Sequence, residues 1–291
     1  MNCYGLNYFW GIFLNDNSTI FSILTHFSGI IYRLAELANA IIFLGTAGAR
    51  FMVARQLLAS GGAWLSLGGT QILLDPGPGS LVQATKRKLD PSKLDAIILS
   101  HKHLDHSGDI NIMIEAMTES GRKRRGVVFA PHDALDEDPV ILSYLRSFPE
   151  KIETLTEGSS YKVNDVSFVT PIRHQHPVET YGFIFRTPQH TFSWITDTNY
   201  FDNLSSYYEG ELLIINVVML DPRVPVDHLS LPEAKKIVEE KKPKIAILTH
   251  FGMNMWRARP WELAKKLTEE TGVSVIAARD GMRFDLARLW E

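Results

Sequence analysis

The chain has 291 residues, of which 45% are hydrophobic and 22% charged, and its formal net charge is −3. These values are ordinary for a globular protein with a sizeable core, and the near-neutral charge gives no bulk electrostatic argument for nucleic-acid or membrane binding. The single cysteine, Cys3, excludes an intrachain disulfide framework and a thiolate-rich metal site, and it favours a reducing, cytoplasmic compartment.

Residues 1–39 differ from the rest of the chain because they are rich in aromatic residues and nearly uncharged. Their apolar run Tyr8–Leu14 is too short to span a bilayer, and no basic region precedes it, so we expect neither a transmembrane segment nor a signal peptide. Three interpretations stay open: a packed accessory segment, an interfacial or partner-binding helix, or translated sequence upstream of the true start. We therefore divide the chain into an N-terminal extension, 1–39, and one domain, 40–291.

From residue 40 the pattern predicts a β-meander, with strands over Ile41–Leu44, Ala63–Leu67 and Gln71–Leu74 that are separated by glycine pairs. The LGTAG stretch, 44–48, is interpreted as a turn near a functional site. It lacks the Gly-Lys-Ser/Thr ending of a phosphate-binding loop and opens no clear helix. Asp75 follows the third strand.

The most informative stretch is LDAIILSHKHLDH, in which a buried strand, Leu94–Leu99, is followed by His101, His103, Asp105 and His106. Imidazole and carboxylate groups are the ligands that suit Zn, Fe or Mn. The histidines at 101 and 103 can point the same way in an extended chain, while the next pair turns toward a neighbouring position. The spacing therefore predicts two adjacent metal positions.

After this motif, Ser107 is expected to cap a helix whose apolar stripe runs from Ile110 to Met117. The cationic stretch GRKRRG, 121–126, is interpreted as a solvated connection to the strand Val127–Ala130 rather than a nucleic-acid contact, because no aromatic residues interleave it. Residues 133–160 are expected to form helix and loop.

The second half opens with a predicted hairpin, Val166–Val169 and Tyr181–Phe185, that flanks two candidate ligands, His174 and His176. Local pattern does not choose between these two histidines. The next predicted strand, Thr191–Thr196, ends at Asp197.

Two further histidines lie next to the ends of predicted helices or strands. A buried strand is expected over Glu211–Leu220, and Ser230 with Glu233 forms a capping box that starts a helix, so His228 lies on the loop before it. His250 lies just beyond a strand that ends at Leu248. A last helix is expected at about Pro260–Thr271 and a strand at Val273–Ala277.

The HKHLDH motif resembles the HxHxDH signature of the metallo-β-lactamase superfamily, and the resemblance extends over about residues 40–286. DHLS and LTHF, with 22 residues from His228 to His250, together with ARDGM, are similar to ribonuclease Z and the related cyclic phosphodiesterases. The resemblance implies an α/β protein with a four-layer αβ/βα sandwich. It also implies two divalent metal ions, with Zn expected and Mn or Fe as alternatives.

The resemblance also implies roles for individual residues. His101, His103 and His176 would hold one ion, Asp105, His106 and His250 the other, and Asp197 would bridge them. Asp75 would brace the metal loop, while His174 and Asp227 would support a ligand or contact the substrate.

The leading functional hypothesis is a phosphodiesterase that uses metal-bound hydroxide. Its catalytic residues would be Asp105, through the metal, and His228 as general acid for the leaving alkoxide; the neighbouring Asp227 could orient the ring of His228. A histidine, His250, rather than a cysteine at the second metal position favours this chemistry.

The alternatives are a transfer-RNA 3′-processing endoribonuclease, a glyoxalase II-type thioesterase and, least favoured, a metal-binding scaffold without activity. Only 20 residues separate His176 from Asp197, which leaves no room there for the RNA-gripping arm of transfer-RNA-processing relatives. We therefore expect a small-molecule or short-oligonucleotide phosphodiester as substrate rather than long RNA. A homodimer is one assembly that we consider.

Overall fold

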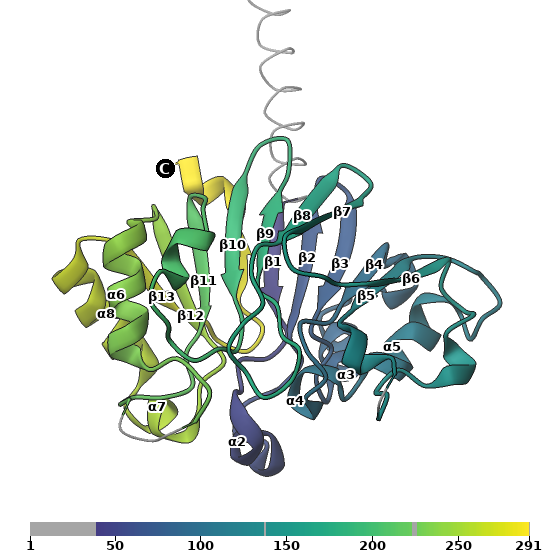
Figure 1. Cartoon of the computed structure of the whole chain (residues 1–291), viewed down its shortest axis with the longest axis horizontal. Helices are drawn as coiled ribbons and strands as arrows, with labels where there is room; N and C mark the ends of the chain where they lie inside the picture. The colour runs from purple at the N-terminus through teal and green to yellow at the C-terminus, as the bar shows by residue number, and fades with distance from the viewer. Residues whose placement is uncertain (1–38, 137, 223–225, 291) are drawn as a thin grey trace, which may run out of the picture.

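Two seven-stranded sheets pack face to face in the computed structural model, which describes residues 39–136, 138–222 and 226–290. Helices cover the outer face of each sheet, so the molecule has four layers (Figure 1). The predicted α/β class and αβ/βα sandwich are confirmed. Apart from Asn39, the N-terminal extension lies outside the described residues.

Each sheet combines an antiparallel part with a parallel part. The first has the order β14 (Arg283–Asp285), β1 (Ala40–Phe43), β2 (Ala63–Leu67), β3 (Thr70–Leu74), β4 (Ala96–Ile98), β5 (Val127–Ala130) and β6 (Lys151–Thr154). The second has the order β13 (Ser274–Ala277), β12 (Ile245–Thr249), β11 (Leu212–Asn216), β10 (Thr191–Ile195), β9 (Phe183–Arg186), β8 (Val166–Thr170) and β7 (Ser159–Val163).

The helices divide between the outer layers and one edge of the sandwich. They are α2 (Ala49–Arg55), α3 (Ser80–Lys86), α4 (Leu104–Ser107), α5 (Ile110–Met117), α6 (Leu231–Lys241), α7 (Met253–Arg257) and α8 (Pro260–Thr271). In Figure 1, α3 and α5 flank the first sheet, α6 and α8 flank the second, and α2, α4 and α7 lie at the lower edge. No helix in the described ranges is long and apolar enough to cross a membrane.

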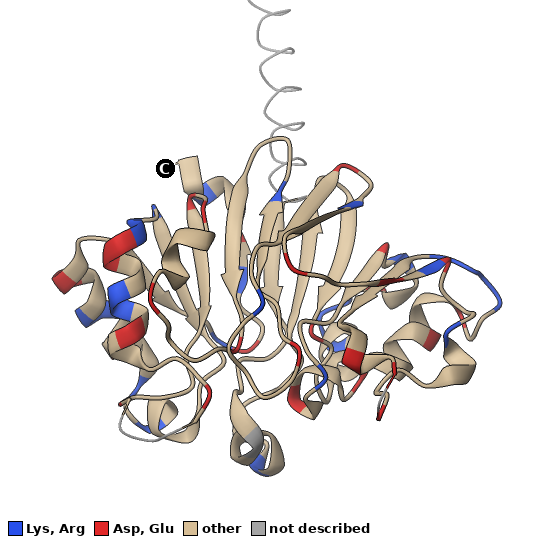
Figure 2. Ribbon diagram, in the orientation of Figure 1, with Lys and Arg blue, Asp and Glu red and all other residues tan. Residues whose placement is uncertain are grey.

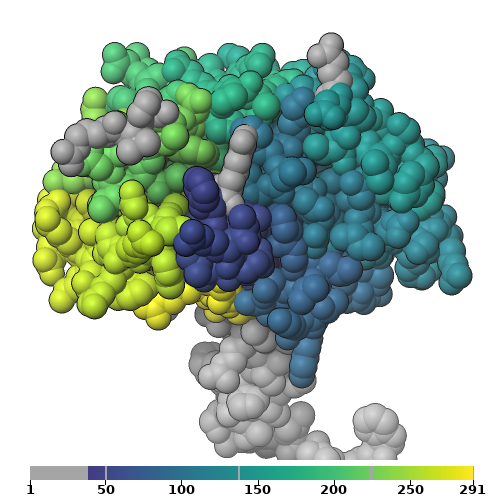
Figure 3. Space-filling model, turned by 90° about the horizontal axis from the view of Figure 1, so that it is seen from below, coloured from purple at the N-terminus to yellow at the C-terminus, as the bar shows by residue number. Residues whose placement is uncertain are grey.

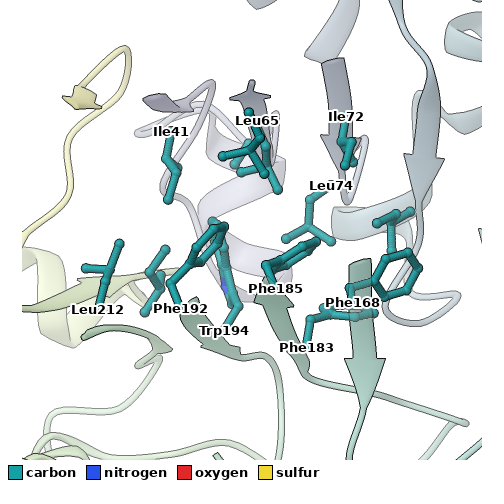
Figure 4. Close-up of a cluster of buried hydrophobic side chains, with 14 of the residues drawn as sticks. Ile41, Leu65, Ile72, Leu74, Phe168, Phe183, Phe185, Phe192, Trp194 and Leu212 are labelled. Carbon is teal, nitrogen blue, oxygen red and sulfur yellow. The ribbon is translucent and has the colours of Figure 1, made fainter. Parts of the chain in front are cut away.

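The alternation of side chains along the strands explains the layers. In β1, Ile41 and Phe43 point into the core between the sheets, whereas Ile42 packs in the cluster under α3 and α5. Figure 4 shows the inter-sheet core, where Ile41 and Leu65 of the first sheet face Phe192 and Trp194 of the second. Burying one such side chain contributes about 1.5–3 kcal/mol, which fixes the two sheets against each other.

Several sequence-based predictions of local structure need correction. Ser107 does not cap the long helix; it ends α4, and its hydroxyl donates to the Lys102 carbonyl, while Asp109 precedes α5. The stretch 133–160 contains the edge strand β6, which was predicted as helix and loop. Its two partly buried and two exposed positions gave no apolar pattern, so only pairing with β5 makes it a strand.

The cationic segment 121–126 makes contacts within the chain. Arg125 donates to the Ser92 carbonyl at 2.5 Å, and Arg124 donates to the Pro149 carbonyl at 3.3 Å. In Figure 2, charged residues lie mainly on outer helices and loops, whereas the central strands are largely uncharged. These contacts agree with the interpretation of the segment as a connection.

Candidate metal centre

Seven histidine and aspartate side chains meet near the carboxyl ends of strands from both sheets, among them β4 of the first sheet and β10 and β12 of the second. They form two groups, and within each group the candidate ligand atoms all lie within 4.8 Å of one another. The groups are His101, His103 and His176, and Asp105, His106, Asp197 and His250. All seven proposed ligands are therefore brought together, four of them from the segment after β4 that includes the start of α4.

The first group consists of imidazoles alone. His103 Nδ1 lies 3.0 Å from His176 Nε2, and the ring of His101 lies 4.8 Å and 5.0 Å from the rings of His103 and His176. Ring nitrogens that face one another repel unless a proton or a metal ion lies between them. This geometry suits a cation.

The second group places two carboxylates among two imidazoles. The Asp105 carboxylate lies 3.7 Å from His106 Nε2 and 3.6 Å from His250 Nε2, and Asp197 Oδ1 lies 3.4 Å from His250 Nδ1. These separations are longer than direct hydrogen bonds, and they leave room for an ion among the four groups.

Asp197 lies between the two groups. Its Oδ2 atom is 3.3 Å from His106 Nε2 in one group and 3.8 Å from His101 Nε2 in the other. A single carboxylate that faces both sets of nitrogens has the geometry of a bridging ligand.

Five candidate ligand atoms of the two groups are buried and unsatisfied. His101 Nε2, His106 Nε2, Asp197 Oδ2 and both ring nitrogens of His250 have no hydrogen-bond partner among the described residues. Each such atom costs about 1–3 kcal/mol when left unpaired, so their concentration at one point requires a partner. Imidazole nitrogens with carboxylate oxygens fit a divalent Zn, Mn or Fe ion.

Asp75 organises the histidines of the first sheet. Its carboxylate accepts hydrogen bonds from the Ser100 amide at 2.6 Å, the Ser100 hydroxyl at 2.8 Å and His106 Nδ1 at 2.9 Å. The Ser100 hydroxyl also lies 3.0 Å from His101 Nδ1. Protonated Nδ1 atoms leave the Nε2 lone pairs of both rings turned toward the centre, which is the arrangement that the bracing role proposed for Asp75 requires.

Neutral groups orient the ligands from the second sheet. His176 Nδ1 donates to the Asp227 backbone carbonyl at 2.9 Å, and the Asn216 amide donates to Asp197 Oδ1 at 2.8 Å. The Asp227 carboxylate accepts from Asn199 at 2.5 Å instead of orienting the ring of His228. Asp227 thus acts on His176 through its main chain.

His174 lies outside both groups. It is buried, its Nδ1 lies 3.1 Å from the Asp197 carbonyl, and its Nε2 bonds the Tyr208 hydroxyl. Burial lowers the pKa of His174 to about 4, so the ring is neutral. Of the two candidate histidines in this hairpin, His176 faces the metal centre and His174 supports the loop that carries Asp197.

His228 lies at the rim of the centre without belonging to either group. Its Nδ1 is 3.4 Å from Asp197 Oδ2, and its ring lies 5.2 Å from that of His176. Its side chain is 17% exposed, so one edge of the ring is accessible to a substrate. Burial lowers the pKa of His228.

The charges of the centre are mutually dependent. Burial lowers the pKa of His101, and it lowers the pKa of His103 to about 4. Burial alone would raise the pKa of Asp197, but the surrounding His250 and His106 hold it well below its usual range. Burial opposes the charge on His106, yet Asp197, Asp105 and Asp75 together raise its pKa, so the carboxylates require a cation beside them.

Two glycines allow the loops to close around the centre. A Cβ atom on Gly48 would lie 2.5 Å from His250 Nδ1, and one on Gly77 would lie 2.0 Å from the Asp105 carbonyl. The LGTAG stretch is therefore a turn against a proposed ligand, as interpreted, although the short helix α2 does follow it.

Sequence reasoning missed three supporting residues: Ser100, Tyr208 and Asn216. Asn216 ends the strand LLIIN, where a polar residue after four apolar ones is a signal that could have marked it. Ser100 directly precedes the motif, and Tyr208 lies on a distant loop with no such signal.

The fold and the metal-ligand geometry define a class of protein, and comparison with known sequences agrees. The model of the beta-lactamase superfamily domain matches residues 70–251. An uncharacterized protein of Methanocaldococcus jannaschii is 30% identical over 254 residues, which cover 84% of this chain and 94% of that protein. The chain belongs to the metallo-β-lactamase superfamily, and this membership implies divalent metal binding and supports a metal-dependent hydrolase.

Two further similarities are narrower. The ribonuclease Z of Thermococcus sibiricus is 30% identical over 152 residues, which cover 50% of this chain and 47% of that enzyme. The crystal structure of the metallo-β-lactamase fold protein YhfI from Bacillus subtilis superposes with a TM-score of 0.71 at 23% identity, and the match covers 84% of this chain and 98% of that protein. At this identity the structural likeness shows the fold.

Proposed function

We propose that this chain is a dinuclear metal-dependent phosphodiesterase. The observation that carries the proposal is the position of Asp197, whose Oδ2 faces His106 of one ligand group and His101 of the other. His101, His103 and His176 would hold one ion, and Asp105, His106 and His250 the other, with Zn favoured and Mn or Fe as alternatives. When bound, such a pair supplies Lewis acidity that activates water and neutralises charge on a phosphate.

The chain's own residues would divide the remaining work. Asp75 and Ser100 hold the ring orientation of His106 and His101. His228, beside Asp197 but in neither group, is the candidate donor of a proton to the leaving alkoxide. The phosphodiester class is supported by the similarity to a ribonuclease Z, since a ribonuclease cleaves phosphodiesters.

Reconstitution tests the proposal. Protein loaded with Zn or Mn should bind close to two equivalents by elemental analysis, and it should cleave a chromogenic phosphodiester faster than a thioester or a lactam. Saturation at one equivalent would contradict the dinuclear site. Turnover of the thioester alone would contradict the phosphodiesterase assignment and support a thioesterase. Turnover of precursor transfer RNA alone would support the endoribonuclease.

A further inference from the structure

A cleft of about 780 Å³ opens beside the proposed metal centre. The residues that line it come from the segment with the proposed ligands His103 and Asp105, from α2 and from the loop 138–140. The apolar lining residues are Val53, Ala54, Leu104, Pro139 and Val140. Figure 3 looks onto this face, with α2 in purple between the blue N-terminal half and the green and yellow C-terminal half.

A second cavity at the centre is much smaller than the cleft. A cavity that touches Asp105, His106 and His250 has a volume of about 30 Å³, which is enough for little more than a water molecule. Of these two spaces, the cleft, which shares Asp105 with the small cavity, is the one with room for a substrate group larger than a few atoms.

Leu104 marks the cleft as a binding surface. It lies between the proposed ligands His103 and Asp105, yet its apolar side chain is 72% exposed. A large apolar side chain that is exposed at a functional site is covered in the bound state, because burying it against an apolar group is favourable.

The charges of the cleft disfavour a second phosphate. Among the described side chains that line it, the cation is Lys102, whose Nζ atom lies 3.9 Å from the carboxylate of Asp133. Asp138 adds a carboxylate to the wall. A chain of phosphates along this cleft would meet like charge, whereas an uncharged group would not.

We propose that the cleft binds a neutral, nucleoside-sized group attached to the phosphate that the metal centre holds. Its volume lies in the range of small-molecule sites, and its lining combines apolar contact with few polar groups. This inference rests on the proposed function, because that function places the phosphate on the metals. It narrows the substrate to a nucleoside phosphodiester with no further phosphate on the cleft side.

Equilibrium binding tests the cleft independently of turnover. Titration calorimetry on the zinc-loaded full chain would compare methyl phosphate, thymidine 5′-monophosphate and thymidine 3′,5′-bisphosphate. The nucleoside monophosphate should bind at least about tenfold more tightly than methyl phosphate, and the second phosphate should give no further gain. Leu104→Asn and Val53→Asn should each remove most of the nucleoside advantage while methyl phosphate binds as before.

Leu57→Asn is the matched control, because Leu57 is an exposed apolar residue just after α2 that does not line the cleft. Equal affinity for methyl phosphate and thymidine monophosphate would overturn the proposal, as would tighter binding of the bisphosphate. If Leu104→Asn loses metal, the binding data of Val53→Asn test the proposal in its place. Nucleoside-dependent binding without cleavage of any diester would support the proposed nucleoside-binding cleft but contradict the proposed phosphodiesterase activity.

Discussion

The two halves of the sandwich deliver their proposed ligands in different ways. The first half supplies four within residues 101–106, on one continuous segment that runs from the end of β4 into α4. The second half supplies His176, Asp197 and His250 from three separate loops. A contiguous motif can be recognised from the sequence alone. Dispersed ligands come together only in the folded chain, where β10 and β12 both pair in parallel with β11.

The halves also differ in how they orient these side chains. The buried carboxylate of Asp75 fixes His106 in the first half, while a backbone carbonyl fixes His176 and an amide fixes Asp197 in the second. An anionic partner raises the basicity of a ligand more than a neutral partner does. We therefore expect the two halves to respond unequally to substitution.

Removing the side chain that joins the halves should have the largest effect. Asp197→Ala takes away the oxygen that faces both groups, so the chain should retain less than one equivalent of metal. The loss of activity should exceed the roughly 10²–10³-fold typical of removing a single stabilising group. Elemental analysis with a diester assay measures both. His176→Ala, which affects one group, should keep close to one equivalent; full metal content in Asp197→Ala would refute the bridge.

His228→Ala should leave both metals bound and lower kcat on an alkyl diester by about 10²–10⁴-fold. The deficit should shrink on a nitrophenyl diester, whose leaving group is stable as an anion. Because burial lowers the pKa of His228, the protonated fraction grows only as the pH falls, so the deficit should be larger at pH 6 than at pH 8. Equal deficits on both diesters at every pH would assign the residue to substrate binding instead.

Asp75→Asn and Asn216→Leu test the two modes of support. Each should weaken metal binding by about 10–100-fold, with the larger loss for Asp75→Asn because it removes a buried negative charge beside His106. Competition with a chelator measures the affinities. A larger loss in Asn216→Leu would reverse the comparison between the halves.

His174→Gln should change stability in a pH-dependent way. The folded chain keeps His174 neutral to a pKa of about 4, whereas the unfolded chain protonates it below about 6.5. The contribution of neutral His174 to the free energy of unfolding is therefore complete above pH 6.5 and is lost as the pH falls toward 4. Between pH 7.5 and pH 5 the stability gap between wild type and variant should narrow by about 2 kcal/mol. Urea unfolding of metal-free protein measures this gap, and a constant gap would contradict the assignment.

Removal of residues 1–38 should have the smallest effect. We propose that the domain from residue 40 binds metal without them, but Asn39 should stay, because its carbonyl accepts from the Leu286 amide at 2.9 Å and its side chain accepts from Gly68 at 2.8 Å. Metal content and diester turnover should equal those of the full chain. An insoluble or metal-free product would place the extension within the fold.

The sequence by itself determined the superfamily, the approximate positions of most strands along the chain and the segment that carries His101 to His106. Apolar runs that end in polar residues are local signals, and a motif of four ligands within six residues leaves little choice of chemistry. Strand β6 was not predicted, because it has no alternating apolar pattern in its sequence and is stabilised by pairing with β5.

Only the tertiary structure distinguishes the positions of His174 and His176, which lie two residues apart with the same chemistry, and it favours His176 as the proposed ligand. His176 Nδ1 donates to the carbonyl of Asp227, 51 residues later in the chain, and this bond directs His176 Nε2 toward His103. His174 instead bonds the buried Tyr208 hydroxyl. The contact of Asn216 with Asp197 and the cleft beside Leu104 also became visible only in the tertiary structure. Side-chain direction depends on partners that are distant in the chain, and no local pattern records them.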